Sequence, residues 1–209
     1  MNNTPKLFKI SLTKLLLIIF FSFVIVLHVS ADDGLYERGI ELVEQKQYEK
    51  ALKAFELGAK TGDLNAMTAL GIMYITGVGV IQNDKKGFKY VQDAANKSHP
   101  KAQYTLGAIY YLGAGVSADF NKAFSWISLS AEQGYSDAQH NLAQMYEAGE
   151  GVSKDFKKAY EYYLKAARSG NLDSQIKVAQ MYQEGIGVMK NLEKSAYWLK
   201  KIEESKAGN

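Results

Sequence analysis

The chain has 209 residues, of which 47% are hydrophobic and 22% charged, an ordinary globular composition that excludes an extensively disordered protein. It contains no cysteine, which excludes disulfide bonds, thiol chemistry and a cysteine-linked lipid anchor. Three of its 25 basic residues but none of its 22 acidic residues lie in the first 31 positions, so the remainder balances 22 against 22. We therefore expect neither a nucleic acid nor an anionic membrane surface as the partner.

The first segment, residues 1–31, has the three parts of a secretory signal peptide. Lys6, Lys9 and Lys14 make a basic start, and an uncharged apolar run follows from 15 to 29. Ala31 then offers a small-residue cleavage site. We expect cleavage after Ala31 and a periplasmic or secreted protein. The alternative is an uncleaved segment that anchors the protein in the inner membrane, although the run is short for a span of about 20 residues.

From residue 62 onward, the sequence repeats with a period of 36 residues and without insertions. Each unit contains a Gly-x-Gly pair, with a tyrosine before it and a valine after it. The pairs begin at Gly77, Gly113, Gly149 and Gly185. So many matched columns at one fixed spacing predict a repeat protein.

Each unit predicts two helices. In the first unit, Ala66, Leu70 and Tyr74 are spaced four apart, so they share one face of a helix. The glycine pair ends that helix, because the residue after a helix commonly has φ > 0. An Asn or Asp then caps the next helix by accepting a backbone N–H. These capping residues are Asn83, Asp119, Asp155 and Asn191.

The chain is therefore predicted to be all-α, a solenoid of helix-turn-helix repeats. An N-terminal capping hairpin, 32–61, follows the signal peptide, and its shorter loop lacks the glycine pair. Three repeats follow at 62–97, 98–133 and 134–169, and the segment 170–209 holds a fourth repeat and a polar C-terminal cap. A polar last helix is what a terminal repeat needs in order to face water.

The motifs of the second unit resemble those of Sel-1-like repeats. They are the string Ala102 to Tyr110, Gly113-Ala-Gly-Val116, Asp119, Lys122-Ala123, Trp126 and Ala131-Glu-Gln-Gly134. The resemblance covers about residues 62–208, and the hairpin before them resembles a tetratricopeptide unit. It implies a right-handed α/α superhelix of the tetratricopeptide type and a role in assembling protein complexes. Some exported members are cysteine-rich and linked to β-lactam binding, and that chemistry is not carried over to a chain without cysteine.

One face of each first helix varies between units, while the opposite face repeats. A varying column is free of the stacking contacts, and in related solenoids this face lines the concave binding surface. It is apolar and aromatic in the first two units and polar in the last two, and exposed apolar patches mark interaction sites. We predict that it binds a partner protein or peptide. The candidate residues are Ile72, Ile75, Tyr104, Ala108, Tyr111, His140, Asn141, Gln144 and Gln180. The alternative for the two tyrosines is packing against a neighbouring repeat, and for the polar trio it is simple solvent exposure.

Nothing in the sequence singles out a catalytic, metal or cofactor site. The Gly-x-Gly pairs lack the Lys-Ser/Thr ending of a phosphate loop, and their recurrence fits helix-ending turns. We interpret Glu147, Glu150 and Glu184 as solvated turn residues. The prediction is a monomeric binding protein that is not an enzyme and needs no cofactor. The alternative is a periplasmic protein that binds or weakly hydrolyses cell-wall or β-lactam compounds.

Overall fold

The computed structural model describes residues 34–207, so the predicted signal peptide at 1–31 lies outside the described residues. Helices joined by turns make up this part of the chain, and it contains no strand. The first helices of its hairpins are α2 (Leu35–Glu44), α4 (Leu64–Thr76), α6 (Pro100–Leu112), α8 (Ser136–Ala148) and α10 (Leu172–Glu184). The second helices are α3 (Tyr48–Thr61), α5 (Asp84–Asn96), α7 (Phe120–Glu132), α9 (Phe156–Arg168) and α11 (Leu192–Ala207). Over the same residues, no helix has the length and apolar composition needed to cross a membrane.

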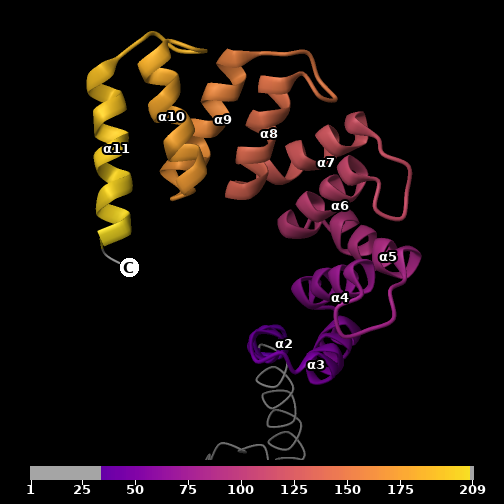
Figure 1. The fold of residues 1–209 in the computed structure, drawn as a ribbon. Helices are drawn as coiled ribbons and strands as arrows, with labels where there is room; N and C mark the ends of the chain where they lie inside the picture. The colour runs from indigo at the N-terminus through magenta and orange to yellow at the C-terminus, as the bar shows by residue number, and fades with distance from the viewer. Residues whose placement is uncertain (1–33, 208–209) are drawn as a thin grey trace, which may run out of the picture.

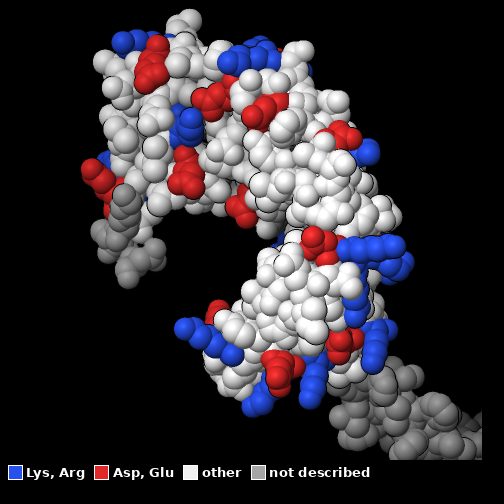
Figure 2. Space-filling view, turned by 45° about the vertical axis from the view of Figure 1, so that its right-hand side comes forward, with Lys and Arg blue, Asp and Glu red and all other residues white. Residues whose placement is uncertain are grey.

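The hairpins stack in chain order into an arch (Figure 1). Each helix packs mainly on its neighbours in the chain, and α4 also contacts α2 and α6. In Figure 1, α2 and α4 lie on the inner side of the arch, with α3 and α5 outside them. Figure 2 shows the hollow that this curvature creates. The predicted all-α solenoid of helix-turn-helix repeats is confirmed.

The predicted turn chemistry is present in every unit. The first glycine of each pair ends its helix in the left-handed region, with φ of 71° at Gly77 and 81° at Gly149. The side chains of the four predicted capping residues then accept backbone N–H groups at 2.9–3.0 Å. Because glycine adopts a positive φ without strain, the glycine pair sets the direction in which the chain returns.

The repeated leucine column forms the centre of the stack. Leu70, Leu106, Leu142 and Val178 are at most 1% exposed. Burying each such side chain contributes about 1.5–3 kcal/mol to stability. Leu70 and Leu106 belong to two separate apolar clusters, and Leu142 and Val178 share a third, so the same position of the first helix supplies the core of each part of the stack.

A buried glutamine joins each of three units to the unit before it. Gln139 and Gln175 each donate a side-chain N–H to the carbonyl of an alanine at the end of the preceding helix, over 3.2 Å. Gln103 makes the same contact over 3.5 Å. The same carbonyls also accept a backbone N–H from the following turn, from Gly134 at 3.0 Å and from Gly170 at 3.2 Å, so the glutamine adds a second hydrogen bond that ties one repeat to the next.

Candidate functional site

A pocket of about 310 Å³, called here the first pocket, opens between α6 and α8. Its apolar floor includes Ile127 and Met145, each 2% exposed. Five of the nine predicted binding residues line it, and the exposed Leu112 and the half-buried Glu150 complete its lining. These five are Tyr104, Ala108, Tyr111, Asn141 and Gln144. The arrangement combines an apolar interior with polar groups at its edge, as small binding sites commonly do.

Tyr104 forms one end of the first pocket. Its hydroxyl accepts a hydrogen bond from Asn141 Nδ2 at 3.0 Å, and its ring lies 5.4 Å from that of Tyr135 between centroids. Burial raises the pKa of Tyr104 above its ordinary value. Because its hydroxyl proton is not used by Asn141, Tyr104 can donate it to a ligand.

Tyr111 forms the other end. Its hydroxyl donates to Glu150 Oε2 at 2.6 Å, and its ring meets the edge of Phe120 with centroids 5.2 Å apart. The hydrogen bond to Glu150 raises the pKa of Tyr111. The interpretation of Glu150 as a solvated turn residue therefore needs correction, because it is half-buried and fixes a pocket residue.

Tyr104 and Tyr111 combine contacts to a neighbouring repeat with ring surface that lines the first pocket. Each hydroxyl contacts the neighbouring repeat, yet each ring is only half-buried and lines the first pocket. Tyr104 and Tyr111 thus hold the walls in place and leave ring surface accessible. Gln144 is exposed on the opposite wall, and Ala108 between the two rings leaves space for a side chain to enter.

The other four predicted residues lie elsewhere. Ile72, 37% exposed, lines a second pocket of about 330 Å³ between α2 and α4. Ile75 is half-buried and packs against α5 beside Gly87, so it serves stacking. His140 is half-buried and bonded to the next repeat, and Gln180 is exposed outside both pockets.

The second pocket is almost entirely apolar. Its walls come from the N-terminal hairpin and α4, and one basic residue, Lys101, reaches it from α6. The Lys101 ammonium donates to the Tyr36 hydroxyl at 2.7 Å. The apolar lining includes Ile40, Val43, Phe55, Ala69 and Met73.

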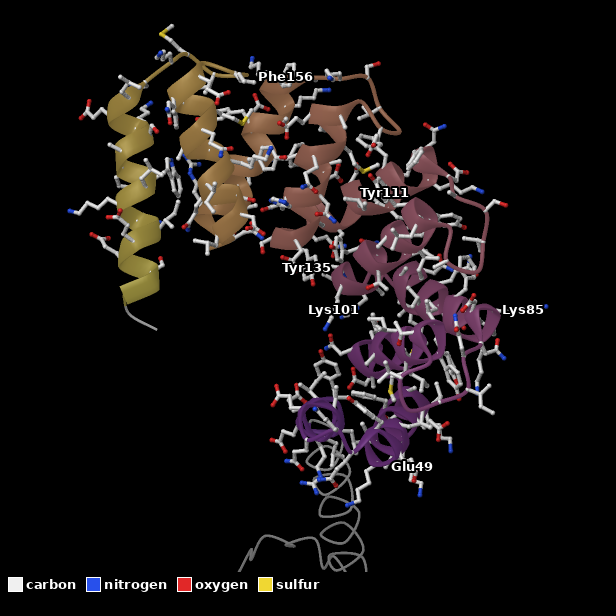
Figure 3. All side chains as sticks on the ribbon, in the orientation of Figure 1. Glu49, Lys85, Lys101, Tyr111, Tyr135 and Phe156 are labelled. Atoms are coloured by element: carbon white, nitrogen blue, oxygen red, sulfur yellow. The ribbon has the colours of Figure 1, made fainter. Side chains whose placement is uncertain are left out.

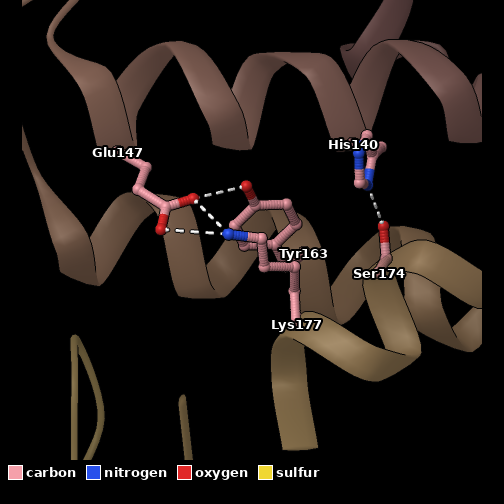
Figure 4. Close-up of polar contacts among 5 residues, drawn as sticks. All are labelled: His140, Glu147, Tyr163, Ser174 and Lys177. Atoms are coloured by element: carbon pink, nitrogen blue, oxygen red, sulfur yellow. Dashed lines mark hydrogen bonds and ion pairs between the residues drawn. The ribbon is translucent and has the colours of Figure 1, made fainter. Parts of the chain in front are cut away.

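His140 belongs to a polar cluster that joins three helices (Figure 4). Its Nδ1 lies 2.7 Å from the Ser174 hydroxyl, while Glu147 accepts from the Tyr163 hydroxyl at 2.7 Å and from Lys177 at 3.2 Å. Burial lowers the pKa of His140, so the ring is neutral at pH 7. Ser174 and Tyr163 are fully buried, so this cluster fastens α8, α9 and α10 together and does not present a nucleophile. Glu147, like Glu150, is an internal partner rather than a solvated residue.

Sequence reasoning missed Tyr36, Lys101 and Tyr135, all of which border the inner face. Figure 3 shows Lys101 and Tyr135 on the inner side of the arch. A signal was present for Lys101, because its column changes from Asn65 through Lys101 to Asp137 between repeats. Within residues 34–207, no group of three or more His, Cys, Asp or Glu side chains is arranged to hold a metal ion.

An arch of stacked helical hairpins with pockets between its first helices defines an α-solenoid repeat protein. The chain belongs to the Sel1 repeat family, whose model matches residues 34–63, 64–99, 100–135, 136–171 and 172–204. The hairpin predicted as an N-terminal cap thus also carries the family pattern. A comparison with curated protein sequences found no match.

Solved structures of the same fold include two at 28% identity. One is a protective antigen of uropathogenic Escherichia coli that displays an SLR fold, with a TM-score of 0.73 over 85% of this chain and 39% of that chain. The other is a Sel1 repeat protein from Oxalobacter formigenes, with a TM-score of 0.66 over 76% of this chain and 63% of that chain. The chain therefore spans less than two thirds of each of these relatives.

Proposed function

We propose that this protein is an exported adaptor that binds a segment of a partner protein on the inner face of its arch. Sel1 repeat proteins generally mediate protein–protein interactions. The observation that carries the proposal is the first pocket, where residues that vary between repeats surround an apolar floor. Positions that vary while the scaffold repeats are free to be shaped by a partner.

The chemistry of the first pocket favours a protein segment as its ligand. Tyr104 and Tyr111 offer large, rigid ring surfaces and hydroxyl groups, which suits them as interface anchors. Asn141 and Gln144 bring amide groups that can bond to a peptide backbone. A partner side chain that enters beside Ala108 would contact both rings.

A capture experiment tests the binding site. The full chain is immobilised and exposed to envelope proteins of its native cell, beside a Tyr104→Ala/Tyr111→Ala double variant. The matched control replaces two aromatic residues outside both pockets, Phe156 and Tyr197, which are 40% and 60% exposed. We expect the wild type and the control to retain a partner that the Tyr104→Ala/Tyr111→Ala variant loses. All three proteins should have equal helix content by circular dichroism. Equal retention by all three proteins would contradict the proposal.

Export is supported by the pattern of residues 1–31, and cell fractionation with intact-mass measurement tests it. A periplasmic or secreted chain that begins at Asp32 is the expected result. A full-length chain in the inner-membrane fraction would identify the anchored alternative. A full-length chain in the cytoplasm would refute export and leave the binding proposal standing.

A further inference from the structure

One basic side chain, Lys101, lies between the two pockets. It extends from α6, whose other residues Tyr104, Ala108 and Tyr111 line the first pocket, and it borders the second pocket beside Tyr36. Lys101 is half-buried, and its ammonium donates a hydrogen bond to the Tyr36 hydroxyl. The phenol satisfies one of the three N–H donors, and the Tyr36 ring, with its centroid 5.3 Å from the ammonium, adds a weak cation–π attraction that does not neutralise the charge.

A row of tyrosines connects the two pockets across this point. The Tyr36 hydroxyl accepts a hydrogen bond from Lys101. Tyr36 also lies close enough to Tyr135 to contribute to the raised pKa of the Tyr135 phenol. Tyr135 in turn packs against Tyr104 at the edge of the first pocket. Lys101 and Tyr135 both lie on the inner side of the bend (Figure 3). The inner face is therefore one continuous strip, with an apolar pocket at each end and a cation between them.

The charge of this strip changes sign along the arch. Among the described residues, ion pairs involve Lys89, Lys122, Lys177 and Lys200, and Lys101 has no carboxylate partner. The residues one and two repeats further along the same column are Asp137 and Asp173, both exposed. A carboxylate on a ligand is thus attracted at Lys101 and repelled beyond Tyr135.

The distance between the two pockets suits a short peptide segment of a partner. The pockets lie between α2 and α4 and between α6 and α8, about two helix spacings apart, which is roughly 16–20 Å. An extended chain advances about 3.3 Å per residue, so five or six residues span this distance.

We propose that the two pockets and Lys101 form a single recognition strip for a partner segment with an apolar side chain at each end and an acidic side chain between them. This inference rests on the proposed function and specifies the chemistry of the partner. The apolar groups fill the two pockets and exclude water around Lys101. In that drier setting, the bond from Lys101 to a carboxylate is stronger than at an open surface.

Selection from a phage-displayed library of random peptides on the full chain tests this proposal. We expect the wild-type protein to enrich peptides with Asp or Glu flanked by apolar residues. The Lys101→Glu variant is expected to enrich Lys or Arg at that position instead. The matched control is Lys85→Glu, because Lys85 is exposed and lies on the outer side of the arch (Figure 3). It is expected to keep the acidic preference.

One wild-type-selected peptide is then synthesised with its acidic residue kept or replaced by the corresponding amide. The amide form is expected to bind at least about tenfold more weakly to the wild type, and to show no such deficit on Lys101→Glu. The decisive second variant is Ala108→Trp, which fills the first pocket and leaves Lys101 in place. Peptides that lose binding to Ala108→Trp but show no acidic preference would overturn this inference and leave the proposed function intact. Failure to select any peptide that depends on Ala108 would overturn both.

Discussion

The Tyr111 hydroxyl donates a 2.6 Å hydrogen bond to Glu150, which joins α6 to the turn that ends the first helix of the next repeat. The two residues are 39 positions apart, so the bond fixes one repeat on its neighbour at the rim of the first pocket. It also holds the Tyr111 ring in the orientation that lines this pocket. The wall of the proposed site and the stacking of two repeats thus depend on the same contact.

Breaking this contact from either side should give the same modest loss of stability. Tyr111→Phe and Glu150→Ala, which remove the donor and the acceptor, are each expected to lower the free energy of unfolding by about 1 kcal/mol, the usual net contribution of a hydrogen bond. The double variant should lose scarcely more than either single variant, because both changes remove one interaction. Urea denaturation of the four proteins measures this coupling. Fully additive losses would show that the bond contributes nothing to stability. Glu150→Ala should also lower the pKa of Tyr111, because it removes the hydrogen bond that raises it, and absorbance titration follows this change.

Ser98 marks a place where the repeat departs from its own pattern. It has a φ of 60° and stands in the column of Gly62, Gly134 and Gly170, whose φ values are 97°, 89° and 93°. A side chain in this region is strained, whereas glycine is not. We expect Ser98→Gly to raise the free energy of unfolding by up to about 1 kcal/mol, since the relief of strain outweighs the greater freedom of glycine in the unfolded chain. Thermal unfolding measures it.

The reverse change supplies the control for Ser98. Gly134→Ser places a side chain at a position with the same sign of φ and with open space around it. Because no neighbour obstructs the new side chain, a loss of stability reports backbone strain, reduced by the smaller freedom of serine in the unfolded chain. A lower melting temperature for Gly134→Ser with no gain for Ser98→Gly would mean that local contacts already compensate for the strain at Ser98.

The sequence predicted the scaffold well because the scaffold is local and repeated. The spacing of Ala66, Leu70 and Tyr74, the glycine turns and the capping residues each act within one unit, and four copies make every column visible. The structure places these features where the spacing requires them. The same logic placed Tyr104, Ala108 and Tyr111 on one face, and the structure shows that this face carries a pocket.

What the sequence could not predict is how side chains on the variable face meet across repeats. The burial of Ile75 and the His140–Ser174 contact depend on how closely neighbouring units pack against each other. A single aligned position of the repeat does not specify this distance. Glu150 was misinterpreted for the same reason, because its partner lies in the preceding unit. Lys101 was overlooked because its position beside the second pocket follows from the curvature of the arch.

The two glycines of one pair should tolerate substitution very differently. At Gly149, an added Cβ would have its nearest neighbour in Lys154 at 3.4 Å, an ordinary contact. At Gly151, it would collide with the backbone oxygen of Phe120 in the preceding repeat. Both residues have a positive φ, of 81° and 70°, so both alanine variants carry similar backbone strain.

We therefore expect Gly151→Ala to destabilise the protein more than Gly149→Ala. Backbone strain accounts for about 1 kcal/mol or more in each variant. The collision with Phe120 adds the cost of moving one repeat relative to its neighbour, typically about 1–3 kcal/mol for overpacking. Urea denaturation of the two variants gives the difference. Equal losses would show that the inter-repeat contact at Gly151 adjusts freely.

Tyr135 should make the protein sensitive to alkali. Burial raises its pKa to about 12, and the charge of Asp137 acts in the same direction. In the unfolded chain a tyrosine titrates near pH 10. Between about pH 10 and 12 the unfolded state therefore binds fewer protons than the folded state, and the free energy of unfolding falls as the pH rises. The stabilising contribution of the protonated phenol is fully present below pH 10 and is lost as the pH passes through 12.

Replacing Tyr135 by phenylalanine removes the group whose ionisation causes this pH dependence of stability. Tyr135→Phe keeps the ring that packs on Tyr104 and eliminates the ionisable group. We expect the variant to lose less stability than the wild type between pH 9 and about 12, as measured by urea denaturation at a series of pH values. Tyr104, whose pKa burial also raises, continues to titrate in the variant, so part of the alkaline loss remains. If wild type and variant lost stability in parallel over this range, the Tyr135 phenol would have to be as well solvated in the folded protein as in the unfolded chain. That would place it outside the row of tyrosines on the inner face.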